Sequence, residues 1–296
     1  MDRSQYQRPP KTLWNRIITP KLRRKMRYPW GRLTKDLRQL PGVIVIGTQK
    51  GGTSSIFRYL MQHPQFFNAI NKEVHFFDYR YDKGMAWYQA MFPIKRSLPP
   101  GAITGEATPF YLYHPLVPQR IAESLPDTSF IVLLRNPVDR ALSHYYHNVR
   151  RGRETRPIEQ AFDAEASSIA EEKARLQSGE IFKPENYRHF SYTERGLYAE
   201  QLARWFACFP RERFFIRTSE SFYAGGNDFM REVFEFLGID SSFQVPNLTP
   251  RNVVIPRGED SEMRARLADY FAPHNRRLEE LLGISYGWSG QAPEVD

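Results

Sequence analysis

Short apolar runs alternate along the chain with longer stretches in which apolar residues recur every three or four positions. The apolar runs have the length of buried strands, at residues 43–46, 102–105, 129–134 and 214–217. The helical spacing predicts helices over residues 53–63, 137–151, 197–209, 227–237 and 261–282. Residues 157–190 are polar and charged with helical stretches, so we expect a surface excursion beside the core.

This alternation predicts an α/β fold, in which one parallel sheet is flanked by helices and ligands bind at the carboxyl ends of the strands. The chain has 296 residues, of which 41% are hydrophobic, enough for the core of a single domain. The apolar runs are shorter than the roughly 18 residues that a membrane span needs. The first residues also lack the apolar core of a signal peptide. We therefore expect a cytoplasmic protein.

The positive charge lies at the start of the chain. Residues 1–40 contain twelve Lys and Arg and two acids, whereas the whole chain has a net charge of +9, so residues 41–296 carry a net charge of about −1. We expect two parts, a basic N-terminal arm over 1–41 and a folded domain over 42–296. The arm could rest peripherally on an anionic membrane, bind a polyanion or be solvated. The near-neutral body argues against a nucleic-acid partner.

Cysteine and histidine usage predicts neither disulfides nor metal. Cys208 is the only cysteine, so no intrachain disulfide can form, which is typical of a reducing compartment. Its aromatic neighbours predict that Cys208 is buried in helix packing, and we do not expect a catalytic thiol. His144 and His147 are three residues apart on a predicted helix, but no acidic ligands accompany them.

The most informative segment is Ile44-Val-Ile-Gly-Thr-Gln-Lys-Gly-Gly-Thr-Ser-Ser55. A buried strand followed by a glycine loop and a helix presents free backbone N–H groups and the positive end of a helix to an anion. Gly51 and Gly52 allow close approach of the backbone, and Lys50 adds a full positive charge. The hydroxyls of this segment add donors, from Thr53, Ser54 and Ser55. The sequence therefore predicts a phosphate-binding loop.

A second anion-binding segment begins where the strand 129–134 ends. Arg135 follows this strand, and Ser143 lies two turns into the next helix. An ATP-binding P-loop would have its lysine after the last glycine and an acid after a later strand to hold magnesium. Here Lys50 precedes the glycines, and Arg135 stands at the place of the acid. The pattern thus favours a second phosphate over a metal ion.

These two segments resemble the motifs of the sulfotransferases that use 3′-phosphoadenosine 5′-phosphosulfate (PAPS). The similarity continues in Lys72-Glu-Val-His-Phe-Phe-Asp78, Thr108-Pro109 and Ser285-Tyr-Gly-Trp288, which resemble the heparan sulfate glucosaminyl 3-sulfotransferases and related bacterial enzymes. It extends over roughly residues 42–288. The resemblance implies a P-loop-like sulfotransferase fold, PAPS as co-substrate, and 3′,5′-adenosine bisphosphate as the product nucleotide.

The resemblance also implies roles for particular residues. Glu73 corresponds to the catalytic base of the family, with His75 in support, and Lys50 stabilises the departing phosphate. Arg135 and Ser143 correspond to the residues that bind the 3′-phosphate. The loop around Lys50 binds the 5′-phosphosulfate, with the residues Gly51, Gly52, Thr53, Ser54 and Ser55. Arg257 and Gly258 correspond to a late loop that closes over the donor.

The chain departs from the heparan-modifying members in ways that bear on the acceptor. Ala107 stands where those enzymes have a lysine that meets the sugar chain, and we expect no counterpart of their disulfide or of their membrane anchor. These departures argue against a heparan-type polyanion and leave a glycan, lipid-linked or small-molecule hydroxyl. The basic cluster Arg150–Arg156 could contact an acidic acceptor or be solvated at a helix end.

Two other functions remain open on the residues alone. A nucleotide phosphotransferase is opposed by the position of Lys50 and by the missing magnesium ligand. A non-catalytic module that binds nucleotide or polyanion is opposed by the presence of Lys50, Glu73 and Arg135 together.

Overall fold

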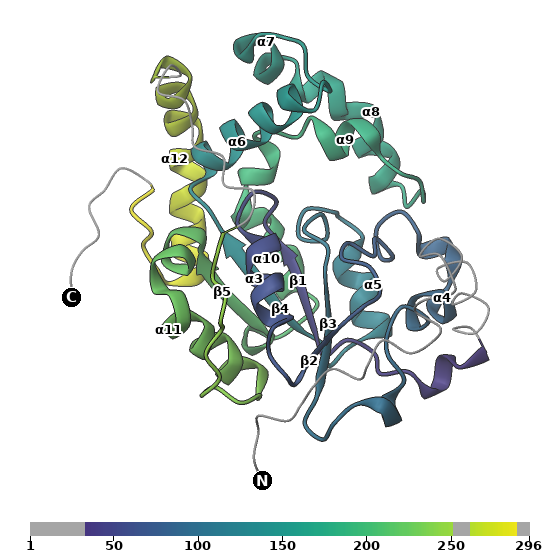
Figure 1. The fold of residues 1–296 in the computed structure, drawn as a ribbon. Coiled ribbons are helices and arrows are strands. Elements are labelled where there is room, and N and C mark those ends of the chain that lie inside the picture. The colour runs from purple at the N-terminus through teal and green to yellow at the C-terminus, as the bar shows by residue number, and fades with distance from the viewer. Residues whose placement is uncertain (1–32, 251–260, 289–296) are drawn as a thin grey trace.

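A computed structural model describes residues 33–250 and 261–288. Its centre is a sheet of five parallel strands in the order β2-β3-β1-β4-β5 (Figure 1). The strands are β1 (Val43–Gly47), β2 (Phe66–Asn68), β3 (Ile103–Ala107), β4 (Ser129–Leu134) and β5 (Phe214–Thr218). The central strand β1 pairs with β3 on one side and β4 on the other, so its carboxyl end lies at the middle of the sheet edge.

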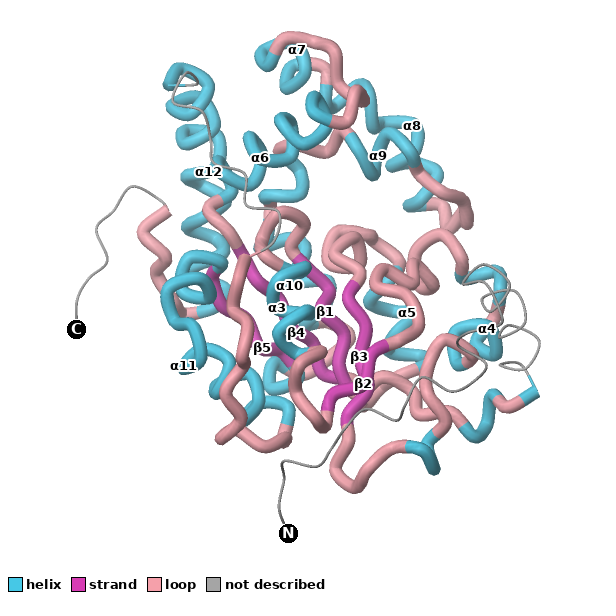
Figure 2. Tube along the Cα trace, viewed as in Figure 1, coloured by secondary structure: helices cyan, strands magenta, loops and turns pink. Residues whose placement is uncertain are grey.

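Helices cover both faces of the sheet (Figures 1 and 2). The helices before the excursion are α3 (Thr53–Leu60), α4 (Met85–Gln89), α5 (Val117–Ser124) and α6 (Pro137–Arg150). The excursion holds α7 (Ile158–Asp163), α8 (Glu165–Gln177) and α9 (Glu185–His189). The remaining helices are α10 (Tyr198–Phe206), α11 (Ser219–Leu237) and α12 (Ser261–Leu282).

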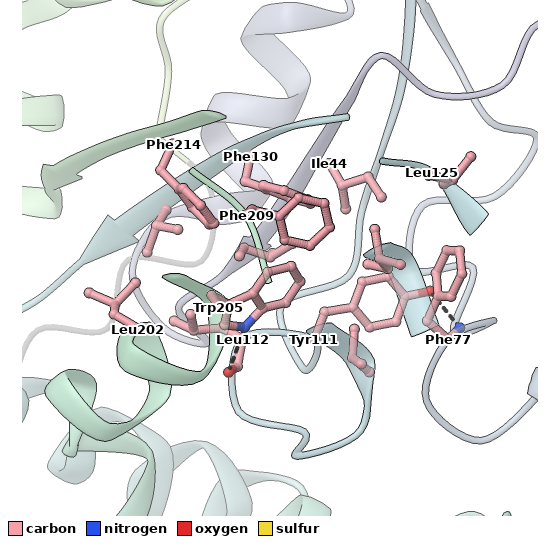
Figure 3. Close-up of a cluster of buried hydrophobic side chains, with 14 of the residues drawn as sticks. Ile44, Phe77, Tyr111, Leu112, Leu125, Phe130, Leu202, Trp205, Phe209 and Phe214 are labelled. Carbon is pink, nitrogen blue, oxygen red and sulfur yellow. Dashed lines mark hydrogen bonds between the residues drawn. The ribbon is translucent and has the colours of Figure 1, made fainter. Parts of the chain in front are cut away.

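Side chains alternate between the two faces along β1, as the two-residue period of a strand requires. Val43 and Val45 pack with apolar residues of α3 and α11 on one face. Ile44 and Ile46 pack on the other face with α5, α10 and the aromatic residues that follow β2. Figure 3 shows the centre of this second cluster, where Trp205 donates a hydrogen bond from Nε1 to the carbonyl of Leu112 (3.2 Å).

The sequence predicted the parallel α/β fold correctly but missed or displaced some elements. β2 has three residues and its side chains run from buried to exposed, so it lacks the length of a detectable apolar run. Helix α11 begins at Ser219 instead of 227, and non-helical angles at Gly226 (φ 52°) divide it. The excursion contains three helices whose buried side chains pack in clusters shared with α6, with α12 and with the segment around Phe110.

Three further expectations concern residues outside the sheet. Cys208 is exposed, which contradicts the predicted burial, because the chain has already left α10 at Phe206. Residues 1–32 of the basic arm and the pair Arg257 and Gly258 lie outside the described residues, so the domain boundary and the late loop stay predictions. Within residues 33–250 and 261–288, no helix is long and apolar enough to cross a membrane.

Candidate active site

The glycine loop joins the carboxyl end of β1 to the first turn of α3. Gly52 caps the helix with left-handed angles (φ 95°), and Lys50 also has a positive φ of 73°. A Cβ on Gly51 would collide with the carbonyl oxygen of Leu133 and would lie 2.8 Å from Cγ2 of Thr48. Only glycine fits at position 51, because β4 passes directly behind the loop. The strand-loop-helix arrangement predicted from the sequence is therefore present.

The second segment lies beside the first loop at the end of β4. Arg135 donates from Nη1 to the carbonyl oxygen of Lys50 (3.1 Å), and its own carbonyl accepts the hydroxyl of Tyr198 (2.8 Å). The side chain of Asn136 then caps α6 by accepting the N–H of Val138 (3.0 Å). These contacts fix the arginine against the loop.

One cavity of about 390 Å³ opens above these two segments. Six of the twelve predicted site residues line it, namely Lys50, Gly52, Thr53, Ser54, Glu73 and Arg135. The other residues that line it are Gln49, Pro109, Asp139, His147, Ser219, Glu220 and Tyr223. His147 could have been found from the sequence because it lies one helical turn after Ser143 on α6. Ser219 and Tyr223 lie far away in sequence, in the first turns of α11, and no motif marks them.

Other predicted residues lie close to the cavity without lining it. Gly51 shapes the loop, and Ser55 is wholly buried in α3. Ser143 is 2% exposed, and its hydroxyl has no hydrogen-bond partner among the described residues. His75 is also buried and lies behind Glu73.

Buried positive charge collects beneath the loop and α6. Arg140 is wholly buried, and neither its Nε nor its Nη1 has a partner in the part of the chain that is described. Both ring nitrogens of the buried His144 also lack one. Within residues 33–250 and 261–288, no carboxylate lies within 4.0 Å of the charged group of Lys50, Arg135 or Arg140. Buried unpaired cations and donors are costly, so this region fits an anionic ligand.

The surplus of cations affects the proton equilibrium of Lys50. Burial and, after it, the charges of Arg150, Arg135, Arg140 and Arg151 together lower the pKa of Lys50 to about 8. Arg150 and Arg151 of the basic cluster thus act on the site electrostatically. Arg156 of the same cluster is instead paired with Glu154 (2.7 Å).

Glu73 faces the loop from the segment that follows β2. Its carboxylate lies 3.6 Å from Nζ of Lys72, which donates to Oγ of Ser54 (2.6 Å), and so Lys72 links the carboxylate to the first turn of α3. Nε2 of His75 lies 3.4 Å from Oε2 of Glu73, and Nδ1 of the same ring lies 2.6 Å from Oδ2 of Asp78. The three side chains form a chain of hydrogen-bonding groups that ends in the cavity.

The two titratable groups of this chain stabilise one another's charged forms. Burial raises the pKa of Glu73, but the hydrogen bond from His75 and the charges of Lys72 and Arg188 outweigh it, so that the pKa is about 2. Burial lowers the pKa of His75, but its bonds to Asp78 and Glu73 outweigh this effect and raise the pKa above its usual value. Glu73, with its side chain 43% exposed, is therefore an anion that reaches the cavity.

Ala107 is wholly buried, and its carbonyl oxygen accepts the N–H of Glu73 (3.0 Å). Position 107 therefore brings no cation to the cavity. The described segments also contain no cluster of three or more His, Cys, Asp or Glu that could hold a metal ion.

A parallel α/β sheet whose central loop and neighbouring arginine gather positive charge around one cavity is the architecture of proteins that bind an anionic ligand at the ends of the strands. Comparison with known proteins identifies the family. The sulfotransferase domain family matches residues 40–254, and the chain belongs to this family. The predicted family is thereby confirmed. Membership of this family favours a sulfotransferase activity over a phosphotransferase activity or a non-catalytic binding module.

Individual relatives agree. The chain is 31% identical over 282 residues to mouse heparan sulfate glucosamine 3-O-sulfotransferase 3A1, covering 87% of this chain and 67% of that protein. It is 27% identical over 314 residues to the membrane-associated sulfotransferase kil1 of Dictyostelium discoideum, covering 84% of this chain and 66% of that protein. The chain thus spans about two thirds of the length of these relatives.

A solved structure supports the fold as well. The sulfotransferase from Alicyclobacillus acidocaldarius is 30% identical, with a TM-score of 0.63, over 86% of this chain and 100% of that chain.

Proposed function

We propose that this protein transfers a sulfuryl group from PAPS to a hydroxyl group of an acceptor and releases 3′,5′-adenosine bisphosphate. The observation that carries the proposal is that Lys50, Arg135 and Glu73 all line the same cavity. Cations for two phosphates and a carboxylate for the acceptor proton are the groups that this reaction requires.

The donor would be held by the two anion-binding segments. Lys50, Thr53, Ser54 and the backbone of the glycine loop would bind the 5′-phosphosulfate, with Ser55 supporting the first turn of α3. Arg135 and Ser143 would bind the 3′-phosphate. The unpartnered hydroxyl of the buried Ser143 and the unpaired cations around it support this assignment. An arginine fork would also distinguish PAPS from donors without a 3′-phosphate.

The chemical step moves one proton and one sulfuryl group. The acceptor oxygen forms a bond to sulfur as its proton passes to Glu73, and the bond from sulfur to the bridging phosphate oxygen breaks. Lys50 stabilises the negative charge that develops on this leaving oxygen. Glu73 is a weak base in the free protein, because nearby cations stabilise its anion. A bound polyanionic donor offsets those cations and raises the pKa of Glu73 towards the range of an effective base.

His75 and Asp78 would orient the base. Asp78 is buried and contacts Nδ1 of His75, which fixes the ring so that Nε2 faces Glu73. We therefore place His75 in a supporting role and the proton transfer at Glu73.

For the acceptor we propose a glycan or small-molecule hydroxyl. The mouse relative is named for a heparan sulfate glucosamine acceptor. Ala107 brings no cation beside Glu73, so we favour an acceptor that is less anionic than heparan sulfate. We also propose a cytoplasmic protein whose arm, residues 1–40, can contact a membrane or polyanion peripherally.

The decisive experiment is calorimetry with 3′,5′-adenosine bisphosphate, with 5′-AMP and with ATP in the absence of magnesium. We expect tight binding of the bisphosphate and binding of the other two that is weaker by at least about tenfold, because only the bisphosphate fills both anion sites. Arg135→Ala should abolish this preference. Equal affinity for 5′-AMP and the bisphosphate would refute the 3′-phosphate assignment, and the use of PAPS with it.

A further inference from the structure

The segment that presents Glu73 has an unusual backbone. It lies between β2 and α4 and contains no helix or strand from Lys72 to Asp78. Glu73 has a φ of 38° and His75 a φ of 54°, in the left-handed region that residues with a Cβ rarely occupy. Such angles are energetically unfavourable, and they persist only where surrounding contacts impose them. The catalytic turn, residues 73–78, must therefore be held by groups outside it.

Two buried side chains hold it through its backbone. The hydroxyl oxygen of Tyr111 accepts the N–H of Phe76 (2.8 Å) and of Phe77 (3.3 Å). Oε2 of Glu106 accepts the N–H of Val74 (3.4 Å). Tyr111 in turn donates its proton towards Oε1 of Glu106 (3.4 Å). Figure 3 shows the Tyr111 hydroxyl turned towards the backbone of Phe77.

Glu106 is an expensive group to bury. It is wholly buried in β3, and its described partners are hydroxyls and one N–H, with no cation. Tyr88 and Thr108 each donate to it over 2.7 Å. Burial raises its pKa to about 7, although these hydrogen bonds oppose the rise. Glu106 does not line the cavity, so contact with a ligand does not explain its burial.

We propose that Glu106 and Tyr111 are positioning residues that hold the catalytic turn so that the carboxylate of Glu73 reaches the cavity. This inference rests on the proposed role of Glu73. Neither residue touches the reacting atoms. They act through the backbone of residues 74, 76 and 77, on both sides of His75. A tyrosine hydroxyl accepts two N–H groups here because its own proton is directed to the carboxylate.

The chain offers a matched control for the test. Tyr113 is also buried, two residues from Tyr111, and its hydroxyl contacts Ser191 (3.1 Å) and Glu194 (2.7 Å) instead of the catalytic turn. Tyr111→Phe and Tyr113→Phe each remove one buried hydroxyl. Both should lower the unfolding temperature, since each leaves buried polar groups unpaired.

Only Tyr111→Phe should impair catalysis. We expect its kcat for sulfuryl transfer to fall about 10- to 100-fold, the range typical of a small misplacement of a catalytic group. The dissociation constant of 3′,5′-adenosine bisphosphate should stay within about twofold of the parent value, because Lys50 and Arg135 are untouched. Equal kcat in Tyr111→Phe and Tyr113→Phe would overturn the proposal.

A second comparison separates this inference from the proposed function. In a Glu73→Gln background, adding Tyr111→Phe should reduce kcat no further, since the hydroxyl acts through Glu73. A full additional loss in the double variant would show that Tyr111 acts elsewhere and would overturn the proposal. Near-parental turnover in Glu73→Gln alone would instead refute Glu73 as the base.

Glu106→Gln provides an independent variant should Tyr111→Phe fail to fold. The amide keeps the shape of the carboxylate but has one oxygen acceptor instead of two. We expect the same pattern, a fall in kcat of about tenfold or more with unchanged nucleotide affinity. Parental kcat in Glu106→Gln would contradict the positioning role.

Discussion

Lys50 and Glu73 line the same cavity, and their surroundings shift the pKa of each. Burial and neighbouring arginines favour neutral Lys50, whereas the partners of Glu73 favour its anion. The free active site therefore holds a lysine that is protonated below about pH 8 and a fully ionised carboxylate. A polyanionic donor would reverse part of both shifts.

At the residue scale, the pKa of Lys50 predicts an alkaline limb in the rate. In the free enzyme Lys50 loses its proton as the pH rises through about 8, so kcat/KM for PAPS should fall above that pH by about tenfold per unit. The bound donor raises the pKa of Lys50, so kcat should fall only at higher pH. Initial rates at limiting and at saturating PAPS between about pH 6.5 and about pH 10 measure the fall in kcat/KM and the fall in kcat.

Lys50→Arg is the control, because arginine keeps its charge throughout this range. The alkaline limb of kcat/KM should disappear in this variant. A limb that persists unchanged would assign the titration to another group.

The carboxylate gives a second prediction at the same scale. Glu73→Gln should lower kcat by about 10²- to 10⁴-fold, the usual contribution of a general base. The variant should still bind 3′,5′-adenosine bisphosphate, because the anion-binding donors remain. Rapid-quench and steady-state rates alongside calorimetry measure the two properties. Parental turnover with intact nucleotide binding would remove Glu73 from the mechanism.

At the scale of elements, the site is assembled from three junctions at one edge of the sheet. The loop after β1, the start of α6 after β4 and the start of α11 after β5 meet there. Oγ of Ser219 lies within hydrogen-bond distance of the carbonyl oxygens of Gly51 (2.7 Å) and Leu134 (2.9 Å), so α11 contacts the other two junctions at once. The loop is therefore held from behind by elements that a local reading of the sequence does not connect.

This support predicts the effect of filling the space behind the loop. Gly51→Ala should lower the free energy of unfolding by about 1–3 kcal/mol and also weaken nucleotide binding, because the new Cβ collides with the backbone of β4. Gly84→Ala is the control. Gly84 has a positive φ of 74° but open space around it, so its substitution should reduce stability without affecting binding. Denaturant unfolding measures the stability of each variant, and calorimetry measures its affinity for nucleotide. Undiminished nucleotide affinity in Gly51→Ala would contradict the close packing of the loop.

At the scale of the whole molecule, the charge is divided unequally. Residues 1–40 carry ten more basic than acidic side chains within a total net charge of +9. Residues 33–40 are the described part of this segment, and they contact the folded domain. Gln39 donates its N–H to the carbonyl oxygen of Pro93 (3.0 Å). Leu33 and Leu37 remain exposed beside them, at 84% and 54%. A basic segment with apolar side chains is the composition of a peripheral membrane contact.

We therefore expect the full chain to sediment with vesicles that contain phosphatidylserine and to be released by salt. Replacing five cations of the arm with serine, at Lys21, Arg23, Arg24, Lys25 and Arg27, should reduce this binding strongly, since each cation near the surface contributes about 1 kcal/mol. Phosphatidylcholine vesicles are the control. Equal binding by the variant and the parent chain would exclude the arm as the contact.

The sequence by itself determined the fold class, the family and six of the thirteen residues that line the candidate site. Strand-length apolar runs and helical spacing predicted the parallel α/β sheet, because burial imposes these periods locally. The order of Lys50, the two glycines and Arg135 indicated two phosphates and no magnesium, because each is a local chemical requirement at a strand end. Such signals lie within a few residues of one another and need no long-range contact.

Only the tertiary structure decided how distant segments complete the site. It showed that Ser219 and Tyr223 line the cavity, that Ser143 is buried, and that Cys208 is exposed. It also revealed that Glu106 and Tyr111 support the backbone around Glu73. These relations depend on the pairing of strands and the packing of helices far apart in the chain. Neither hydrophobic periodicity nor a motif records such contacts, because both describe a residue by its neighbours in sequence and not by its neighbours in space.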